Sequence, residues 1–226
     1  MYDCVAKQAF NRFVFLDGIE DRIIYYLLSE RNKDKEQLEM TYTLWKVLFY
    51  DTPDCLNLPL PSYKDDIVPL IYNGGTFDGS DISSKQNNKK IFRSPHQEEA
   101  WIQEGSLMRI YVDSIVPVND YTATLNIGID TLVHNRIIDI KAEENSRNIV
   151  DVLPDGTEIF VSMKNRLTVM LRCILGLLNG AHVQGVGLLK YNQELSKMSQ
   201  SRYALWNNRN FGGYKTIVST QISGVS

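Results

Sequence analysis

Apolar and polar residues alternate most regularly in two neighbouring segments of the second half of the chain. Every second residue is apolar from Met108 to Asp113, and the same period of two runs from Tyr121 to Asp130. This period predicts β-strands, and the turn residues Pro117 to Asp120 between them predict that the two strands pair in the antiparallel sense. We expect one face of this pair to be covered by protein and the other face to meet water.

A turn and a helix follow in the same half of the chain. Pro154-Asp155-Gly156 separates two short strand-like runs at 149–153 and 157–161, which predicts a protruding β-hairpin. An apolar helix is expected to begin at Ser162 or Asn165 and to end at Asn179-Gly180. Residues 186–191 and 214–222 are interpreted as closing strands. The predicted core of this region comprises apolar residues of the strands and the helix: Ile110, Val112, Leu125, Ile127, Ile129, Leu171 and Ile174.

The first half of the chain is predicted to begin with two helices. Asp17-Gly18-Ile19-Glu20 has the spacing of a capping box and predicts a helix over about residues 17–31. Asp34 is expected to cap a second helix, which Thr52-Pro53 ends. Because each helix carries one apolar stripe, we expect them to form a helical hairpin.

A long loop is expected after the helices. Residues 73–95 are rich in Gly, Ser, Asn, Asp and Lys, which indicates either a disordered loop or one that a partner orders. Three parts result: an N-terminal helical extension at 1–60, an irregular segment at 61–106 and an α+β ring-forming domain at 107–226. The predicted fold is therefore α+β, with a small, mainly antiparallel sheet packed by helices on one face and with long loops.

Composition narrows the class of protein. The chain has 226 residues, 43% of them hydrophobic and 23% charged, with a formal net charge of −3. This composition predicts a folded core, while the negative charge argues against a broad basic surface that wraps DNA. We expect no membrane span and no signal peptide, because no long apolar run or leader pattern occurs. The scattered cysteines Cys4, Cys55 and Cys173 favour folding in a reducing cytosol.

Candidate catalytic chemistry is sparse. His96, His134 and His182 lack the spacing of zinc ligands, so we expect neither a metal site nor a cofactor. Asp139-Ile140-Lys141 has the carboxylate-x-lysine order of metal-dependent nucleases, which gives a magnesium-dependent nuclease as an alternative function. The second carboxylate in that alternative would come from one of three acidic residues: Asp113, Asp130 or Glu158.

Two segments are candidates for contacts with sister subunits or partners. Lys89, Lys90 and Arg93 surround an aromatic residue, a pattern that either grips phosphates or forms a solvated edge. The turn at the tip of the predicted hairpin, Pro154-Asp155-Gly156, is the second candidate. A small sheet has edges with unpaired backbone groups, so a protruding hairpin could pair with the edge of a neighbouring subunit.

The order of these elements resembles the neck and tail-completion proteins of tailed bacteriophages, and the tail-terminator type most of all. The resemblance rests on segments 107–134, 177–180, 186–189 and 211–218. It implies a non-enzymatic structural protein of the virion, assembled in the host cytoplasm. It further implies a ring, commonly a hexamer, that caps the tail tube at the neck. Such a ring contacts neighbouring neck and tail-tube proteins, and DNA passes through it without its sequence being read. Two alternative functions are another ring of the head-to-tail connector and an adaptor that binds through its loops.

Overall fold

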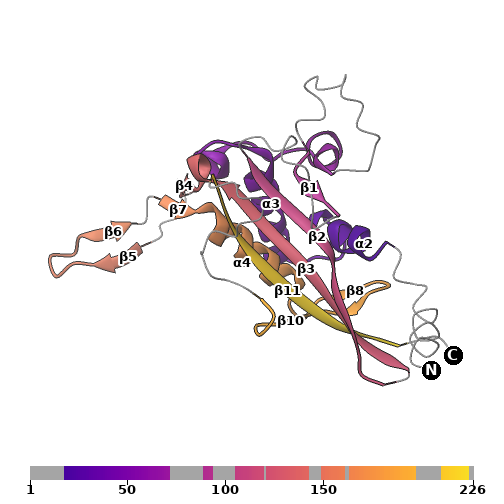
Figure 1. The fold of residues 1–226 in the computed structure, drawn as a ribbon. Coiled ribbons are helices and arrows are strands. Elements are labelled where there is room, and N and C mark those ends of the chain that lie inside the picture. The colour runs from indigo at the N-terminus through magenta and orange to yellow at the C-terminus, as the bar shows by residue number, and fades with distance from the viewer. Residues whose placement is uncertain are drawn as a thin grey trace.

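A five-stranded sheet with helices against one of its faces forms the body of the protein (Figure 1). The computed structural model describes residues 18–71, 89–93, 105–119, 121–142, 149–160, 163–196 and 210–223. The strands are, in spatial order, β1 (Ile91–Phe92), β2 (Ser106–Pro117), β3 (Thr122–His134), β11 (Phe211–Ser223) and β10 (Lys190–Tyr191). Only β1 and β2 pair in the parallel sense within this sheet. The α+β fold with a mainly antiparallel sheet is therefore confirmed.

The predicted β2–β3 pair is confirmed, and it is the longest hairpin of the described chain. The two strands pair from Ser106 opposite Val133 to Pro117 opposite Ala123, with an irregularity in register between Val112 and Ser114. β11 then pairs with β3 along its whole length. β11 thus lies inside the sheet, whereas residues 214–222 were expected to form a closing strand.

The other predicted closing strand, at 186–191, is divided. β9 (Gly187–Leu188) pairs with β8 (His182–Val183), while β10 pairs with β11 at the edge of the large sheet. Gly185 and Gly187 have positive φ, at 74° and 110°, and form the turn from β8 into β9. Between β9 and β10, the Leu189 amide donates a hydrogen bond of 2.8 Å to the Ala181 carbonyl, outside the large sheet.

Three α-helices lie against the sheet within the described residues: α2 (Ile19–Leu28), α3 (Lys35–Phe49) and α4 (Arg166–Leu178). α3 begins as predicted, because Asp34 and Gln37 form a complete capping box. α4 also begins as predicted, with the Asn165 side chain accepting a hydrogen bond from the Thr168 amide.

The predicted capping box of the first helix is wrong. Gly18 is the N-cap of α2, at φ 75°, and no side chain of the described residues caps this end. The Glu20 carboxylate instead accepts a hydrogen bond from the Val112 amide of β2, at 3.4 Å. The Glu20 carboxylate therefore forms a hydrogen bond with the sheet instead of capping its own helix. Asp17 itself lies outside the described residues.

One hydrophobic core joins the helices to the sheet. It contains Ile23 of α2, Leu44 of α3 and Ile174 of α4 together with Ile127 of β3. Most predicted core residues are fully buried, and Val112 and Leu171 are partly buried and packed against the same core. The N-terminal helices thus share the core of the sheet, and that core extends across the boundaries expected at residues 60 and 106.

The sheet face away from the helices was expected to meet water, and that expectation is wrong for its central part. Arg109 and Asp130 on this face are buried and form an ion pair of 2.7 Å. Asn126 is also buried, with its amide oxygen 2.6 Å from the Ser219 hydroxyl. These contacts offset part of the cost of burying polar side chains in a protein interior.

Shorter elements complete the chain. β4 (Asp139–Lys141) pairs with β7 (Met163–Asn165), and the predicted hairpin is confirmed as β5 (Ile149–Val152) paired with β6 (Glu158–Phe160). Short helical turns occupy η2 (Cys55–Asn57), η3 (Tyr63–Ile67), η4 (Val68–Leu70) and η6 (Asn135–Ile137). Most of the long loop predicted at 73–95 lies outside the described residues, but its end supplies β1. No helix in the described ranges has the length and apolar character of a membrane span.

Candidate assembly surfaces and a cleft

The β5–β6 hairpin forms an arm that projects from the body of the molecule (Figure 1). Its tip is the predicted turn of Pro154, Asp155 and Gly156, all exposed. The Leu153 amide donates to the Thr157 carbonyl at 2.8 Å, and Gly156 takes the positive φ of 85° that the turn requires. The sequence therefore located the arm and its tip correctly.

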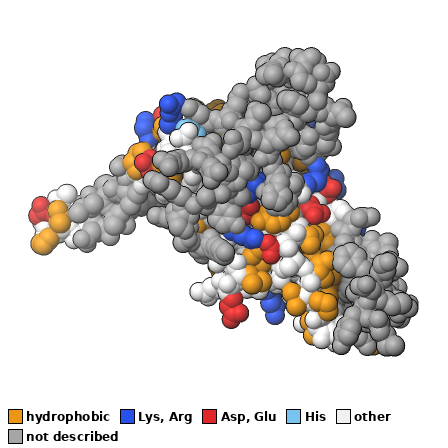
Figure 2. Space-filling model, in the orientation of Figure 1, with side chains coloured by type: hydrophobic (Ala, Val, Ile, Leu, Met, Phe, Trp, Pro, Cys, Tyr) orange, Lys and Arg blue, Asp and Glu red, His pale blue; other side chains and the backbone are white. Residues whose placement is uncertain are grey.

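The surface of the arm tip combines apolar and acidic character. Val152 and Leu153 are 54% and 41% exposed, and Figure 2 shows hydrophobic and acidic side chains together at this end. The Asp155 carboxylate accepts a hydrogen bond from the Thr157 amide at 2.9 Å, and this bond lowers the pKa of Asp155. The tip therefore carries a negative charge at neutral pH.

A second apolar surface lies at the far end of the β2–β3 hairpin, on the opposite side of the molecule from the arm (Figure 1). Val116, Val118 and Tyr121 are 51%, 58% and 61% exposed there. These two ends of the molecule are among the places where apolar side chains are exposed.

The basic segment at 89–93 is tied to the body of the protein. The buried Lys90 ammonium donates to the Leu48 carbonyl at 2.8 Å and pairs with Asp51 at 2.6 Å. Burial lowers the pKa of Lys90, and the Asp51 carboxylate opposes that shift. Lys89 donates to the Pro69 carbonyl at 2.7 Å, and Arg93 pairs with Asp21. Lys90 thus faces the protein interior, while partner contacts of Lys89 and Arg93 stay a prediction.

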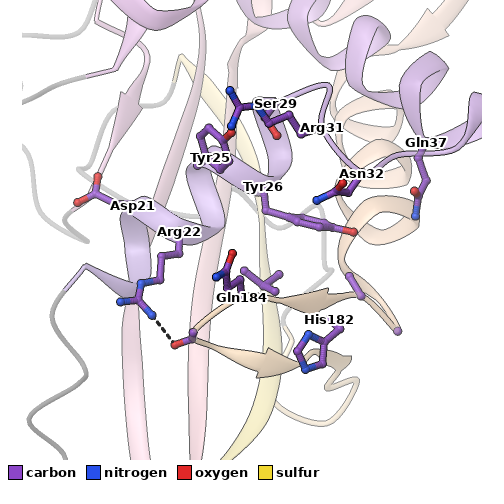
Figure 3. A pocket seen from close by; sticks show the side chains of 14 residues that line it. Asp21, Arg22, Tyr25, Tyr26, Ser29, Arg31, Asn32, Gln37, His182 and Gln184 are labelled. Atoms are coloured by element: carbon purple, nitrogen blue, oxygen red, sulfur yellow. Dashed lines mark hydrogen bonds between the residues drawn. The ribbon is translucent and has the colours of Figure 1, made fainter.

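An open cleft of about 940 Å³ lies between α2 and the β8–β9 turn (Figure 3). Tyr25 and Tyr26 reach it from α2, Arg31 from the loop after α2, and His182 from β8. Tyr25 is 46% exposed there. Because the lining comes from segments about 150 residues apart, no local motif indicated this cleft.

One hydrogen bond joins two residues that line the cleft. The Arg22 guanidinium of α2 donates a hydrogen bond of 2.8 Å to the Gly185 carbonyl in the β8–β9 turn (Figure 3). A side chain at position 185 would collide with Arg22, because an added Cβ would lie 1.6 Å from the guanidinium nitrogen. The contact therefore joins α2 to the turn at one side of the cleft.

Positive charge predominates in the cleft. Arg22 and Arg31 line it together with one acidic residue, Asp21, which pairs with Arg93. The Arg31 side chain is exposed and forms no ion pair with another residue of the described chain. A cation beside two tyrosine rings suits a partner that is acidic and partly apolar.

Several residues of the nuclease alternative form ion pairs with other side chains. Lys141 pairs with Asp54 at 2.9 Å, while Asp130 pairs with Arg109 and Asp113 pairs with Lys215. The Glu158 side chain is outside the described part of the structure. Among the described residues, no three His, Cys, Asp or Glu side chains are grouped so that they could hold a metal ion.

The histidines and cysteines occupy unrelated positions. His134 is buried beside Phe211, with its ring nitrogen accepting the Arg136 amide at 3.3 Å. Cys55 and Cys173 are buried free thiols, and Cys4 and His96 lie outside the described residues. His182, by contrast, is exposed at the rim of the cleft.

Comparison with known proteins identifies a family. Residues 42–220 match the YomW family, so the match begins inside α3 and ends inside β11 and includes the arm. Searches of curated proteins and of solved structures found no significant match.

Proposed function

We propose a structural role in a phage particle for this chain, which belongs to the YomW family of phage-associated proteins. In this proposal copies of the chain assemble into a ring, with a hexamer favoured, at the neck between head and tail. The ring terminates the tail, contacts neighbouring neck and tail-tube proteins and lets DNA pass without reading its sequence. The tail-terminator role is the finer part of the proposal and rests on the resemblance in element order.

The β5–β6 arm is the observation that carries the proposal. An isolated two-stranded hairpin is marginally stable in water, and it gains stability from packing against another surface. The tip of this arm nevertheless exposes Val152 and Leu153. A sister subunit that covers these side chains would stabilise the arm and remove apolar surface from water.

The distribution of exposed apolar residues favours a ring over a two-fold dimer. A contact between two different surfaces relates successive copies by a rotation, and such contacts close into a ring when the rotation divides a full turn. The arm and the opposite β2–β3 end supply unlike surfaces on one molecule. The net charge of −3 suits a channel through which DNA slides, because a strongly basic channel would hold it.

Native mass spectrometry of the full chain over a range of concentrations tests the assembly. We expect a closed oligomer for the wild type, and smaller species for the combined substitutions Val152→Asp and Leu153→Asp at the arm tip. Leu60→Asp is the matched control, since Leu60 is 45% exposed and is not part of the arm. A wild-type chain that stays monomeric at high concentration contradicts the ring.

The location of the protein tests the role in the particle. We expect proteomic analysis of purified phage particles to recover this chain in a fixed ratio to a neck or tail protein, and electron microscopy to place it at the head-to-tail junction. Recovery only from the soluble fraction of infected cells would contradict a structural role.

A further inference from the structure

We infer that the cleft between α2 and the β8–β9 turn receives the arm tip of a second copy of this chain. The inference rests on the proposed ring and names the two surfaces that meet in it. The segment that enters the cleft is the exposed turn around Asp155 together with Leu153. It binds on the side of the cleft that carries Arg31 and Tyr25.

Charge complementarity is the first argument. Asp155 is an exposed carboxylate at the end of the arm, and its hydrogen bond with the Thr157 amide holds it in place. Arg31 is an exposed guanidinium at the cleft that has no carboxylate partner among the described residues. A charged pair of this kind guides two subunits into one relative orientation and selects against wrong contacts.

Apolar complementarity is the second argument. Leu153 is 41% exposed directly before the turn, and Tyr25 is 46% exposed beside Arg31 in the cleft (Figure 3). A tyrosine ring offers a large apolar contact area at a small cost in side-chain entropy, and tyrosine and arginine are enriched where protein interfaces bind most strongly. The tip thus brings a charge and an apolar side chain next to each other, and the cleft offers a partner for each.

The placement of the two surfaces is the third argument. The arm leaves the body on the side of β4 and β7, whereas α2 and β8 lie on the opposite side (Figure 1). An arm therefore does not reach the cleft of its own chain. Contact between unlike surfaces on opposite sides of a subunit is the arrangement from which a ring forms.

Charge reversal in full-length protein tests the inference. Alone, Asp155→Arg places two cations in the contact, and Arg31→Asp places two carboxylates there. Each variant is expected to assemble with an affinity reduced roughly tenfold or more, as for other close charged pairs at interfaces. Both positions are exposed, so circular dichroism and thermal unfolding should stay close to the wild type, with only the Asp155–Thr157 hydrogen bond of the tip lost in Asp155→Arg. Lys64→Asp, another exposed reversal, is the control and should assemble normally.

Restoration is the decisive measurement. The double variant with both reversals is expected to recover assembly. An equimolar mixture of the two single variants is also expected to recover it, because the contacts between unlike copies then pair opposite charges. Oligomers in that mixture should contain both variants in equal numbers by native mass spectrometry.

The outcomes separate the inference from the proposed function. If the wild type assembles and both single variants assemble equally well, the cleft is not the acceptor, although the ring stands. The same conclusion follows if the single variants fail and neither the double variant nor the mixture recovers. If the wild type remains monomeric at high concentration, the ring and this contact are both overturned.

Discussion

The Arg166 guanidinium, in the first turn of α4, donates a hydrogen bond of 3.0 Å to the Val47 carbonyl in the last turn of α3. The same group donates to the carbonyls of Tyr50 and Thr52, at 2.7 and 2.6 Å, and to the Ser106 hydroxyl at 3.1 Å. Arg166 is fully buried. One side chain therefore joins α4, the end of α3 and the start of β2.

Lys90 occupies the same end of α3. It donates to the Leu48 and Phe49 carbonyls at 2.8 and 3.2 Å. The last carbonyls of a helix have no partners within the helix, and the negative end of the helix dipole favours cations there. Two buried cations from distant segments thus complete the hydrogen bonding of one helix end.

Replacing Arg166 by methionine is expected to destabilise the fold strongly. Buried acceptors that lose their donor cost about 1–3 kcal/mol each, so we expect a loss of roughly 3 kcal/mol or more in the free energy of unfolding. Chemical denaturation measures this loss. Arg172→Met, on the exposed face of the same helix, is the control and should change stability little. Equal effects of the two substitutions would show that the carbonyl contacts do not matter.

Gly128 is expected to tolerate no side chain while Tyr111 is present. An added Cβ would lie 2.7 Å from the Tyr111 ring, whose hydroxyl lies 3.2 Å from Asp130. Gly128→Ala should therefore displace the ring and cost about 1–3 kcal/mol, as overpacking does.

A double-mutant cycle with Tyr111→Ala measures the cause of that loss. With the ring removed, Gly128→Ala should cost much less than it does in the wild-type background. An unchanged cost would assign the effect to the backbone and not to the tyrosine.

Lys33 is expected to titrate near neutral pH. Burial lowers its pKa from 10.5 to about 8, although Glu30 opposes the shift. Its ammonium donates to the Leu27 carbonyl at 2.9 Å and to the Thr41 hydroxyl at 2.6 Å. Nuclear magnetic resonance of the Lys33 side chain should show a midpoint close to pH 8, and a midpoint at the ordinary value would contradict the burial.

The sign of the stability change follows from the same pKa. Between pH 8 and 10.5 the unfolded chain keeps the proton on Lys33, while the folded chain has released it. Protonation then favours unfolding, so this group adds stability as pH rises through that window. The stability of the wild type relative to Lys33→Met should accordingly increase from about pH 8 upward. A difference that stays constant or decreases over that window would contradict this linkage.

The two buried thiols are expected to resist alkylation in the folded protein. Burial raises the pKa of Cys173 to about 12 and also raises the pKa of Cys55, and the thiolate is the reactive form. Mass spectrometry after iodoacetamide treatment at pH 8 should find both unmodified, and both modified after unfolding in guanidinium. Rapid labelling of Cys173 under native conditions would show that the core opens around α4.

The elements with local signals were predictable from the sequence. The Asp34–Gln37 capping box, the alternation in β2 and β3 and the turn at Asp155 each depend on residues a few positions apart. The capping box expected at Asp17 failed because its spacing is also compatible with another use of Glu20, the hydrogen bond to β2.

Of the candidate surfaces, one was predictable from the sequence and one was not. The tip of the arm was predicted from its turn residues, and its exposure agrees with that prediction. The cleft was not, because its lining joins α2 to a turn about 150 residues away through the contact of Arg22 with Gly185. A lysine such as Lys90 was expected at the surface, since lysine is rarely fully buried unless it is paired.

The sequence by itself determined where α3, α4, the β2–β3 pair and the protruding turn lie, because hydrogen bonding within a helix and the alternation of a strand are properties of short segments. Tertiary structure alone decided which polar groups are buried. Arg166 and Val47 are 119 positions apart, and Arg109 and Asp130 meet across two strands. Burial of a charge is tolerated only where separate elements bring its partners together, and that condition is set by packing.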